Sequence, residues 1–600
     1  MQLPFGEWLP DQPNHLKQGA NIAKNVYHAK QSYKPVKSLV PYSSNTILST
    51  CLGAGSFRDG ASSVFNFASS QDTIYQLTSG AFTDRGAGGL LLTTAKASCT
   101  ITVSDYGNIG AGKTLSLTKN NGTIIVFTST AGTASGTLFK VETNNNTTAA
   151  NLKTTINAHA DFTATVADAV VTVTRAAVGR DNLTVTSSDT TRLTSTNFTG
   201  GTPLTGDSTD YITFTQFGNY IIVSNGVDAP QYYLMGTSTN FANLSAIATE
   251  GTPPVFRVSG VIRDFLVTGN LPSNTNRVQW SGINDITTWT SGKKLADYQD
   301  LPGSGGQIVH ITSGEVGYIF RQNQIIRMDF VGGATVFRFS VISSNRGAVY
   351  GRTVTQNDRN VFFYSDDGFY QISGDTLIPI GAEKVNRYFD NDLNKAYTDR
   401  ISAAVDPFNQ LAIWSYVSKR STDGNPDSLM IYNYVTKKWT FASISASTIF
   451  TQFFGAYTVE TMDVISENLE DLNISLDTDF WSGGQLYLGA INSDFKAAIF
   501  SGTPLEAELE TDEIEGKPGV RLNITGVRPI IDADTTVTIK SREKLSDTAT
   551  ESVSGTTNNS GVNPVRSSGR YIRANVKVSA GVGWNDAQGI DIIASQAGTR

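Results

Sequence analysis

The stretch Asn360–Ser373, with the sequence NVFFYSDDGFYQIS, consists of two short apolar runs separated by the polar residues Ser365–Gly368. Short runs rich in aromatic and β-branched residues favour strands, and aspartate followed by glycine favours a tight turn, so the stretch predicts a β-hairpin. Short apolar runs that end in a turn, several of them followed by a second strand, recur every few tens of residues, for example at Phe217–Val223, Arg263–Thr268, Val316–Phe320 and Gln410–Tyr416. Repeated hairpins of this kind are typical of a β-propeller, an array of small antiparallel sheets around an axis.

The composition of the chain excludes several classes of protein. Of its 600 residues, 39% are hydrophobic and only 16% are charged, which excludes a disordered chain and argues against long solvent-exposed helices. Lys and Arg number 46 against 53 Asp and Glu, a net charge of -7. Tight binding of a polyphosphate over the whole surface is therefore unexpected, because such binding grows with the number of phosphates neutralised.

Changes in amino-acid composition along the chain predict its domain organisation. We expect an N-terminal segment, residues 1–60, that packs on a platform, and the first propeller strands at 61–95. Residues 96–204, rich in Thr, Asn and Ser, predict an inserted α+β module with a helix from Thr147 to about His159 and Thr148 as its cap. The alternative for this insert is a set of extra propeller strands with long loops. The remainder is expected to form the β-propeller at 205–484, with a helix at Ala382–Asn394, and a C-terminal β platform at 485–600.

The predicted fold class is therefore mainly β. It is a β-propeller with a β-sandwich-like platform formed by the chain termini, plus the inserted small α+β module.

Several motifs associated with catalysis or cofactors occur in the sequence, but the residues around them do not fit those functions. Gly107–Thr114, GNIGAGKT, matches the pattern of a phosphate-binding loop, but it leads into alternating residues typical of a strand rather than into a helix. The four histidines have no metal-ligand spacing, and two cysteines give no disulfide framework. We therefore expect no nucleotide, metal or other cofactor and no membrane span.

Two pairs of carboxylates leave a glycosidase open as an alternative. Such an enzyme needs two facing carboxylates, and Asp366 with Asp367 or Asp285 with Asp297 are the candidates. The competing interpretation is that these aspartates close turns, as aspartates in propeller hairpins commonly do.

The acidic stretch Leu505–Glu515 suggests a second kind of role. Strand alternation places Glu506, Glu508 and Glu510 on one face, opposite Leu505, Ala507 and Leu509. They are candidate channel-lining residues, since a wall of carboxylates on several copies would repel a passing polyanion such as DNA. The alternative is an ordinary half-buried strand with a solvated outer face.

Arginines gather in the same C-terminal region. Arg528, Arg566 and Arg570, together with Tyr571, are candidate subunit-interface residues, because arginine pairs with carboxylates in a bidentate manner. Solvated surface arginines are the alternative.

Several stretches, in their order along the chain, resemble the tail nozzle proteins of short-tailed bacteriophages, also called tail tubular or tail stabilisation proteins. They are Phe5–Asp11, Ala23–Val26, Tyr33–Pro35, Arg263–Gly269, Val278–Ser281, Asn284–Trp289, Phe363–Tyr370, Gly526–Pro529, Val565–Tyr571 and Gly583–Gly589. The resemblance spans nearly the whole chain except the insert, which is similar to small modules within other phage tail proteins.

The resemblance implies a structural virion protein of the tail without enzymatic activity, assembled in the host cytoplasm. It implies a homo-hexameric ring that docks on a tail adaptor or gatekeeper ring and contacts tail fibres or spikes. Genomic DNA would be retained by the ring and released through its lumen on infection, without sequence-specific binding. The rival functions are the glycosidase or depolymerase named above and a receptor-binding adhesin, for which the insert is the best candidate.

Overall fold

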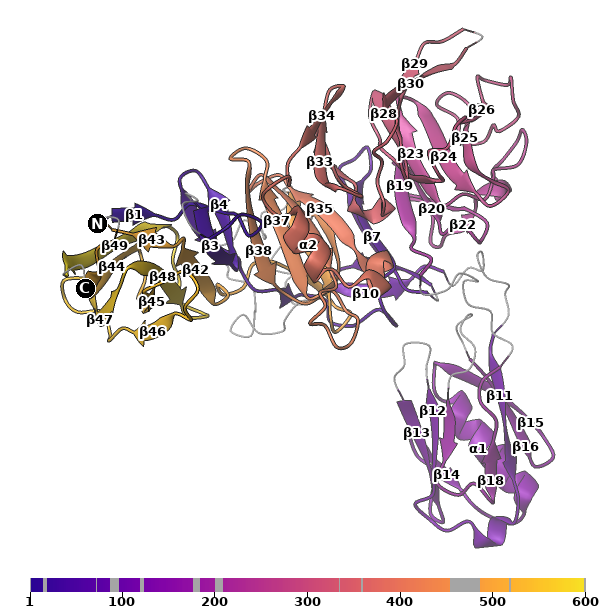
Figure 1. The fold of residues 1–600 in the computed structure, drawn as a ribbon. Helices are drawn as coiled ribbons and strands as arrows, with labels where there is room; N and C mark the ends of the chain where they lie inside the picture. The colour runs from indigo at the N-terminus through magenta and orange to yellow at the C-terminus, as the bar shows by residue number, and fades with distance from the viewer. Residues whose placement is uncertain are drawn as a thin grey trace. The chain divides into compact units, whose positions relative to one another are not determined.

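The computed structural model describes residues 2–14, 19–71, 73–86, 96–118, 124–175, 184–199, 209–333, 335–357, 360–453, 486–516 and 519–597 (Figure 1). The fold is mainly β and propeller-like, with many small four-stranded sheets, which confirms the predicted fold class. The chain divides into two units: the first combines Met1–Ser43 with Leu301–Arg600, and the second is Ser44–Asp300.

The second unit contains three four-stranded antiparallel sheets whose strands follow one another in chain order. They are β7 (Gly53–Arg58), β8 (Val64–Ser69), β9 (Ile74–Thr78) and β10 (Ala81–Asp84); β19 (Thr213–Phe217), β20 (Tyr220–Ser224), β21 (Gln231–Leu234) and β22 (Ala242–Asn243); and β23 (Val258–Ile262), β24 (Phe265–Leu271), β25 (Asn274–Trp280) and β26 (Asp297–Asp300). The first strand β19 lies against β7 and against β23, as inner strands do in a propeller. Because β7 already belongs to a blade, the predicted boundary at residue 60 is too late.

The insert folds as two four-stranded sheets with one helix. The strands are β11 (Ser98–Val103), β15 (Phe162–Ala167), β16 (Val170–Arg175) and β18 (Leu193–Ser195) in one sheet, and β12 (Thr114–Thr118), β13 (Ile124–Thr130), β14 (Leu138–Lys140) and β17 (Val185–Ser187) in the other. The helix α1 (Asn145–Asn157) buries Leu152 and Ile156 in a core that the insert builds from its own residues.

The cap of α1 differs from the expectation. Asn144 is the N-cap, and its side chain accepts a hydrogen bond from Thr147 N at 2.8 Å. The predicted cap, Thr148, is buried in the first turn, where its hydroxyl donates to the Glu142 carbonyl oxygen. Asparagine is among the strongest N-cap residues, so the helix starts earlier than predicted.

The first unit contains further blades of the same design. They are β27 (Ile308–Ile311), β28 (Val316–Arg321), β29 (Ile325–Phe330) and β30 (Phe337–Ser343); β31 (Thr355–Asn357), β32 (Asn360–Ser365), β33 (Gly368–Ser373) and β34 (Thr376–Pro379); and β35 (Ser402–Asp406), β36 (Leu411–Tyr416), β37 (Ser428–Asn433) and β38 (Lys438–Ser443). The hairpin β32–β33 pairs Ser365 with Gly368, so the predicted turn is confirmed. A helix, α2 (Asn386–Asp392), follows and is shorter than predicted.

A strand from the N-terminal segment completes the next blade. The strands β39 (Ala446–Phe453), β40 (Leu486–Asn492) and β41 (Ala497–Ile499) form three quarters of it, and β6 (Val40–Pro41) adds the fourth strand by pairing with β41. Residues 486–499 therefore belong to a blade and not to the C-terminal platform, which corrects the predicted boundary at 484/485. β6, which is distant in sequence, covers the edge of β41, and this edge would otherwise be open to pairing with another chain.

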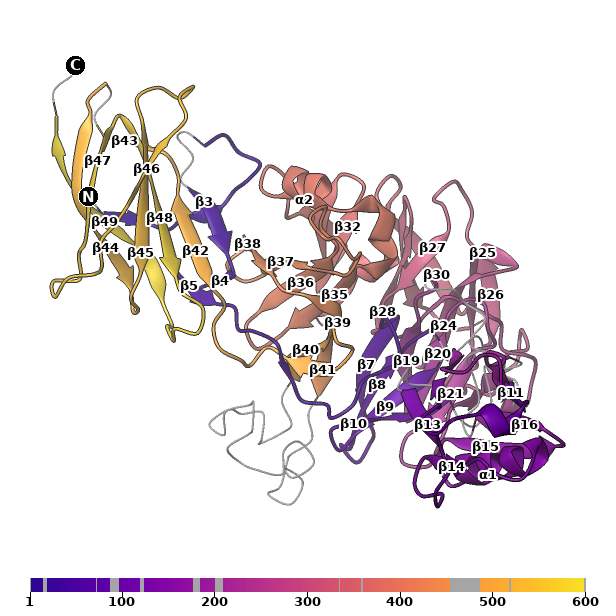
Figure 2. The same ribbon diagram turned by 90° about the horizontal axis from the view of Figure 1, so that it is seen from below.

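The platform consists of two sheets built from both ends of the chain. One contains β1 (Gln2–Pro4), β4 (Val26–Ala29), β5 (Ser32–Pro35), β44 (Leu522–Ile531), β47 (Asn563–Gly569) and β49 (Ala587–Gln596). The other contains β2 (Glu7–Trp8), β3 (Gly19–Lys24), β42 (Ala507–Thr511), β43 (Ile514–Glu515), β45 (Thr536–Arg542), β46 (Thr550–Val553) and β48 (Tyr571–Val578). This second sheet is continuous with the blade β35–β38, because β3 pairs with both β38 and β42. Figure 2 shows the indigo N-terminal strands lying among the yellow C-terminal ones.

Aromatic side chains pack the blade beside the platform. The ring of Trp8, which is 1% exposed, lies 4.9 Å from the ring of Tyr388 and 4.8 Å from that of Phe441. The rings of Trp414 and Trp439 lie 5.6 Å apart in the same core. Trp8 therefore fastens the N-terminal segment to α2 and to β38.

We expect Trp8→Ala to destabilise the first unit by about 3–5 kcal/mol, because it removes a large buried ring and leaves a cavity. Urea unfolding followed by far-UV circular dichroism measures the effect. Phe408→Ala is the matched control: this ring is 71% exposed, so its removal should leave the transition in place. Equal effects of the two substitutions would contradict the packing described for Trp8.

Candidate functional site

The outer face of the second platform sheet holds the predicted acidic residues. On β42, Ala507 and Leu509 point into the core, and Glu508 and Glu510 point to the opposite face, so the predicted alternation is confirmed. The neighbouring β48 alternates in the same way, with Ile572, Ala574, Val576 and Val578 in the core. The two strands therefore present their polar residues on one common face.

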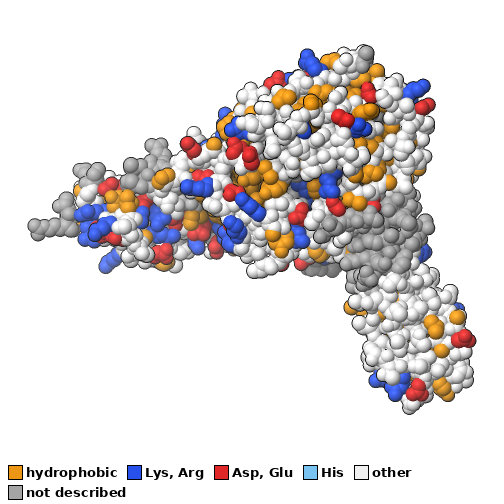
Figure 3. Space-filling model, turned by 45° about the vertical axis from the view of Figure 1, so that its right-hand side comes forward, with side chains coloured by type: hydrophobic (Ala, Val, Ile, Leu, Met, Phe, Trp, Pro, Cys, Tyr) orange, Lys and Arg blue, Asp and Glu red, His pale blue; other side chains and the backbone are white. Residues whose placement is uncertain are grey.

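Strand register places cations beside these carboxylates. Glu508 lies opposite Lys24 of β3 on one side and Lys577 of β48 on the other. Two rows further along β48, Arg573 lies opposite Lys540 of β45, and both cations contact the carboxylate of Glu510. Cations therefore lie beside the carboxylates, and the face is a ladder of mixed charge rather than an acidic wall. Basic and acidic side chains are interspersed on the platform in Figure 3.

Glu510 is the centre of this ladder and is 0% exposed. Its carboxylate lies 2.7 Å from Lys540 Nζ and accepts hydrogen bonds from Asn21 Nδ2 at 2.6 Å, Asn575 Nδ2 at 3.1 Å and Arg573 Nη1 at 3.3 Å. Burial by itself raises the pKa of the Glu510 carboxyl, but the bonds from Lys540, Asn21 and Asn575 outweigh it and lower the pKa below its usual value. Glu510 is therefore a buried, ionised structural group.

The prediction that Glu510 lines a channel is wrong, because a carboxylate with no exposed surface cannot face a passing molecule. Glu508 is half-buried and accepts a hydrogen bond from Asn575 Nδ2 at 2.7 Å, with Lys577 Nζ at 3.8 Å. Glu506 precedes β42 and is exposed. A lining role for Glu506 and Glu508 stays a prediction.

The predicted interface residues lie in two places on the platform. Arg528 on β44 and Arg566 on β47 are exposed on strands of the first sheet. Arg570 precedes β48, with its Nε 3.7 Å from Glu543 Oε2, and Tyr571 is the half-buried first residue of that strand. Whether they contact another subunit stays a prediction.

The loop that resembles a phosphate-binding loop has a different local structure. Lys113 N donates to Ser129 Oγ at 2.8 Å, and the chain then enters β12, the strand that the sequence predicts. Without a helix starting there, the amide groups are not directed together at a phosphate.

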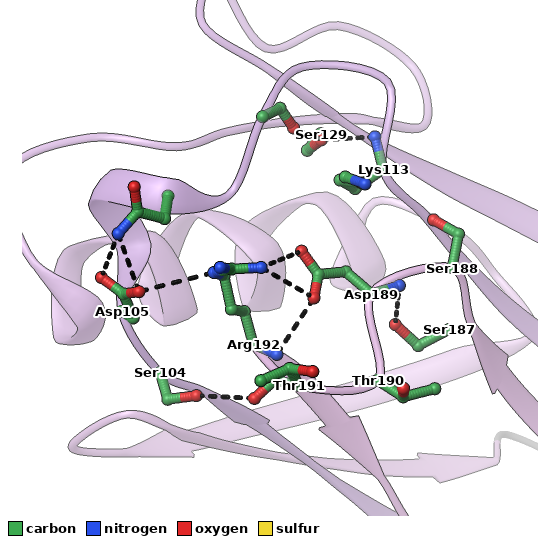
Figure 4. Close-up of polar contacts among 12 residues, drawn as sticks. Ser104, Asp105, Lys113, Ser129, Ser187, Ser188, Asp189, Thr190, Thr191 and Arg192 are labelled. Atoms are coloured by element: carbon green, nitrogen blue, oxygen red, sulfur yellow. Dashed lines mark hydrogen bonds and ion pairs between the residues drawn. The ribbon is translucent and has the colours of Figure 1, made fainter.

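Beside this loop, Arg192 lies between two carboxylates (Figure 4). Its Nε is 3.4 Å from Asp105 Oδ2 and its Nη1 is 3.4 Å from Asp189 Oδ2, so these three charges hold loops of the insert together.

The four aspartates considered for glycoside hydrolysis hold turns or neighbouring side chains. Asp285 accepts hydrogen bonds from Lys294 Nζ at 2.5 Å, Thr287 Oγ1 at 2.7 Å and Thr288 Oγ1 at 2.9 Å. Partial burial opposes its ionisation, but these bonds prevail and lower the pKa of the Asp285 carboxyl, whereas a general acid needs a raised pKa.

The other three aspartates have local partners. Asp297 accepts from Ser291 Oγ at 2.6 Å, and Asp366 accepts from Ser365 Oγ at 3.2 Å. Asp367 accepts from Arg346 Nε at 2.9 Å and from Tyr370 Oη at 2.8 Å. The turn interpretation therefore accounts for these carboxylates better than the catalytic one.

Metal-binding clusters and membrane-spanning helices are both absent from the described ranges. No group of three or more His, Cys, Asp or Glu side chains that could hold a metal ion occurs among those residues. Within the same ranges, no helix is both long and apolar enough to span a membrane.

Comparison with known proteins yields no family. No protein-family model and no curated protein matches the sequence. Among solved structures, the extracellular domain of a hybrid two-component system of B. thetaiotaomicron is 11% identical with a TM-score of 0.25, over 81% of this chain and 51% of its own. The CNH domain of AfRom2 is 7% identical with a TM-score of 0.22, over 48% of this chain and 92% of its own. The chain thus spans about half the length of the first of these structures, and neither likeness bears on function.

We expect Glu510→Lys to destabilise the first unit by about 3–5 kcal/mol, because it replaces a buried paired anion with a cation beside Lys540 and Arg573. The matched control is Glu506→Lys, an exposed position of the same stretch, which should leave the urea midpoint unchanged. Equal midpoints for the two variants would show that the ladder does not stabilise the platform.

The lowered pKa of Glu510 also predicts a pH dependence. Its stabilising contribution is complete above 4.5, the ordinary pKa of the carboxyl, and is lost as the pH falls through the lower folded-state value. Glu510→Gln should therefore be less stable than the wild type at neutral pH, and the gap should narrow on acidification. Thermal unfolding midpoints of the two proteins, measured between neutral and acidic pH, give this difference in stability. A difference that grows toward acidic pH would contradict the lowered pKa of Glu510.

Proposed function

We propose that the chain is a structural subunit of the tail nozzle of a short-tailed bacteriophage. In this proposal six copies form a ring around a passage through which genomic DNA is retained and then released, and the protein has no enzymatic activity. The observation that supports it most is that the two ends of the chain, both of which contain stretches that resemble nozzle proteins, are joined in one platform.

The joint between the ends is made by main-chain pairing. β1 pairs with β49, which places Pro4 opposite Gly589, and Phe5 N donates to Gln588 O at 2.9 Å. The carbonyl oxygen of Leu3 and the Cα of Pro4 lie against Gly589 so closely that no Cβ fits there. The glycine of the C-terminal stretch is thus required by the approach of the N-terminal one.

The other residues of these stretches also act through packing and hydrogen bonding. Asp11 accepts hydrogen bonds from Arg387 N at 2.7 Å and Tyr388 N at 2.8 Å at the start of α2. Asp532 accepts from Asn585 N and Asp586 N, both at 3.0 Å, at the start of the Gly583–Gly589 stretch. Residues that resemble the family therefore shape the chain, which suits a structural subunit.

The corresponding stretches of the second unit are structural as well. The indole Nε1 of Trp280 donates to the Leu295 carbonyl oxygen, and that of Trp289 donates to the Ile286 carbonyl oxygen, each at 2.8 Å. Both rings are buried. They fix the long connection between β25 and β26.

The sheet that runs from β35–β38 through β3 into the platform supports a structural role. β3 pairs with β38 at Lys24 and Phe441, and Asn25 N donates to Phe441 O at 2.8 Å, so blade and platform share one sheet. In the proposed ring, the partners are the other copies, an adaptor or gatekeeper ring and tail fibres or spikes. The protein would lie in the virion tail after assembly in the host cytoplasm.

A receptor-binding adhesin is a second candidate, and the insert favours it. The insert has its own core, including Phe127, Phe139 and Phe162, so it adds a self-contained surface to the chain. This function is compatible with the nozzle, since a ring subunit can carry an accessory module.

The ring itself is testable by mass photometry of the purified chain, alone and with its adaptor. We expect a species of about six times the chain mass of 64.4 kDa. Arg528→Glu should shift it toward the monomer, because it reverses an exposed charge at a predicted contact, whereas Arg338→Glu on β30 is the control. A chain that stays monomeric even when mixed with its adaptor would overturn the nozzle proposal.

A further inference from the structure

A polar cavity opens at one end of the platform, where β47 of one sheet contacts β45 and β46 of the other. Its volume is about 390 Å³, which lies in the range of small-molecule sites. Three arginines line it, Arg521, Arg542 and Arg566, together with Glu543, Asp547 and several Ser and Thr residues. We call this cavity the arginine pocket.

The two carboxylates of the arginine pocket are already engaged. Glu543 Oε1 lies 2.5 Å from Arg521 Nη2, and Asp547 Oδ2 accepts a hydrogen bond from Lys544 N at 3.0 Å. Arg542 is engaged as well, since its Nε donates to Glu513 Oε1 at 2.6 Å and its Nη1 to the Leu545 carbonyl oxygen. These groups form the frame of the pocket and leave little capacity for a ligand.

Two donor groups of the arginine pocket remain unengaged. The Nε of Arg521 is buried and has no hydrogen-bond partner. Arg566, on the exposed side of β47, forms no ion pair with any residue in the described part of the chain. A buried N–H without an acceptor is unfavourable, and a guanidinium with free donors is the preferred partner of an oxyanion.

Hydroxyl groups complete the chemistry. Ser541, Ser567 and Ser568 line the pocket, and Ser567 Oγ and Ser541 Oγ are 2.9 Å apart in a hydrogen bond. Thr548, Thr550 and Ser552 line it as well. Neutral hydroxyl donors beside a planar guanidinium suit the several oxygens of a phosphate, which accepts more hydrogen bonds than a carboxylate does.

We propose that the arginine pocket binds a phosphate group, held by Arg566 and by the Nε of Arg521. The pocket lies within a single chain, so the proposal does not depend on formation of a ring. The phosphate is either free inorganic phosphate or the phosphate of a small organic monoester, whose organic part would occupy the rest of the cavity.

Calorimetric titration of the full chain at near-neutral pH tests the proposal. The probes are inorganic phosphate and glycerol phosphate, each against sodium chloride of equal ionic strength. We expect saturable binding to the wild type and a loss of affinity of at least about tenfold in Arg566→Gln. Arg338→Gln, an exposed arginine on a blade, is the matched control and should bind as the wild type does.

The outcomes separate the two sources and the null result. Tighter binding of glycerol phosphate assigns the pocket to a phosphate monoester, and equal binding of both probes assigns it to free phosphate. Absence of saturable heat with either probe would overturn the proposal, as would equal affinity in the wild type and Arg566→Gln. The ring is tested separately, by mass photometry with Arg528→Glu. A failure of the phosphate proposal can therefore be distinguished from a failure of the nozzle proposal. Thermal unfolding of Arg566→Gln should match the wild type in phosphate-free buffer, since the side chain is exposed.

Discussion

The arrangement of the first unit depends on one side chain, that of Asn25. Its Nδ2 donates to the Glu506 carbonyl oxygen at 2.8 Å on the platform side, and its Oδ1 accepts from Ser443 N at 2.8 Å on the blade side. Its own main chain is in the left-handed region, at φ 58°, which asparagine tolerates better than most residues. Between β3 and β4 the chain thus passes from one platform sheet to the other. At this point the side chain of Asn25 connects the start of β42 with the end of β38.

The position of Asn25 explains why the two ends of the chain must come together. β3 has a blade on one side and the C-terminal β42 on the other. The backbone groups on both edges of β3 therefore find hydrogen-bond partners only when the C-terminal region is present. The same holds for β6, which closes a blade, and for β1, which pairs with β49. Contacts this distant in sequence are slow to form, so the platform is expected to assemble last.

Local features of the fold could be predicted from the sequence, and long-range ones could not. The hairpin at Asn360–Ser373 and the strand Tyr571–Val578 follow from alternation and turn residues, which are properties of neighbours along the chain. Phe217–Val223 was expected as one strand, but Gly218 turns the chain at φ 57° and separates β19 from β20. The blade formed by β39–β41 and β6 gave no signal, because nothing near Val40 specifies a partner more than four hundred residues away.

The acidic stretch shows the same limit at the candidate site. Alternation correctly placed Glu508 and Glu510 on one face, but Lys540 and Arg573, which determine the electrostatic character of that face, lie on other strands. Paired opposite charges produce a field that weakens quickly with distance, and salt screens the remainder within about 8 Å. If the proposed ring threads DNA past this face, the polyanion is therefore neither strongly repelled nor bound. Free sliding would then follow from charge pairing inside each subunit, in which the buried Glu510 stabilises the sheet instead of acting on the DNA.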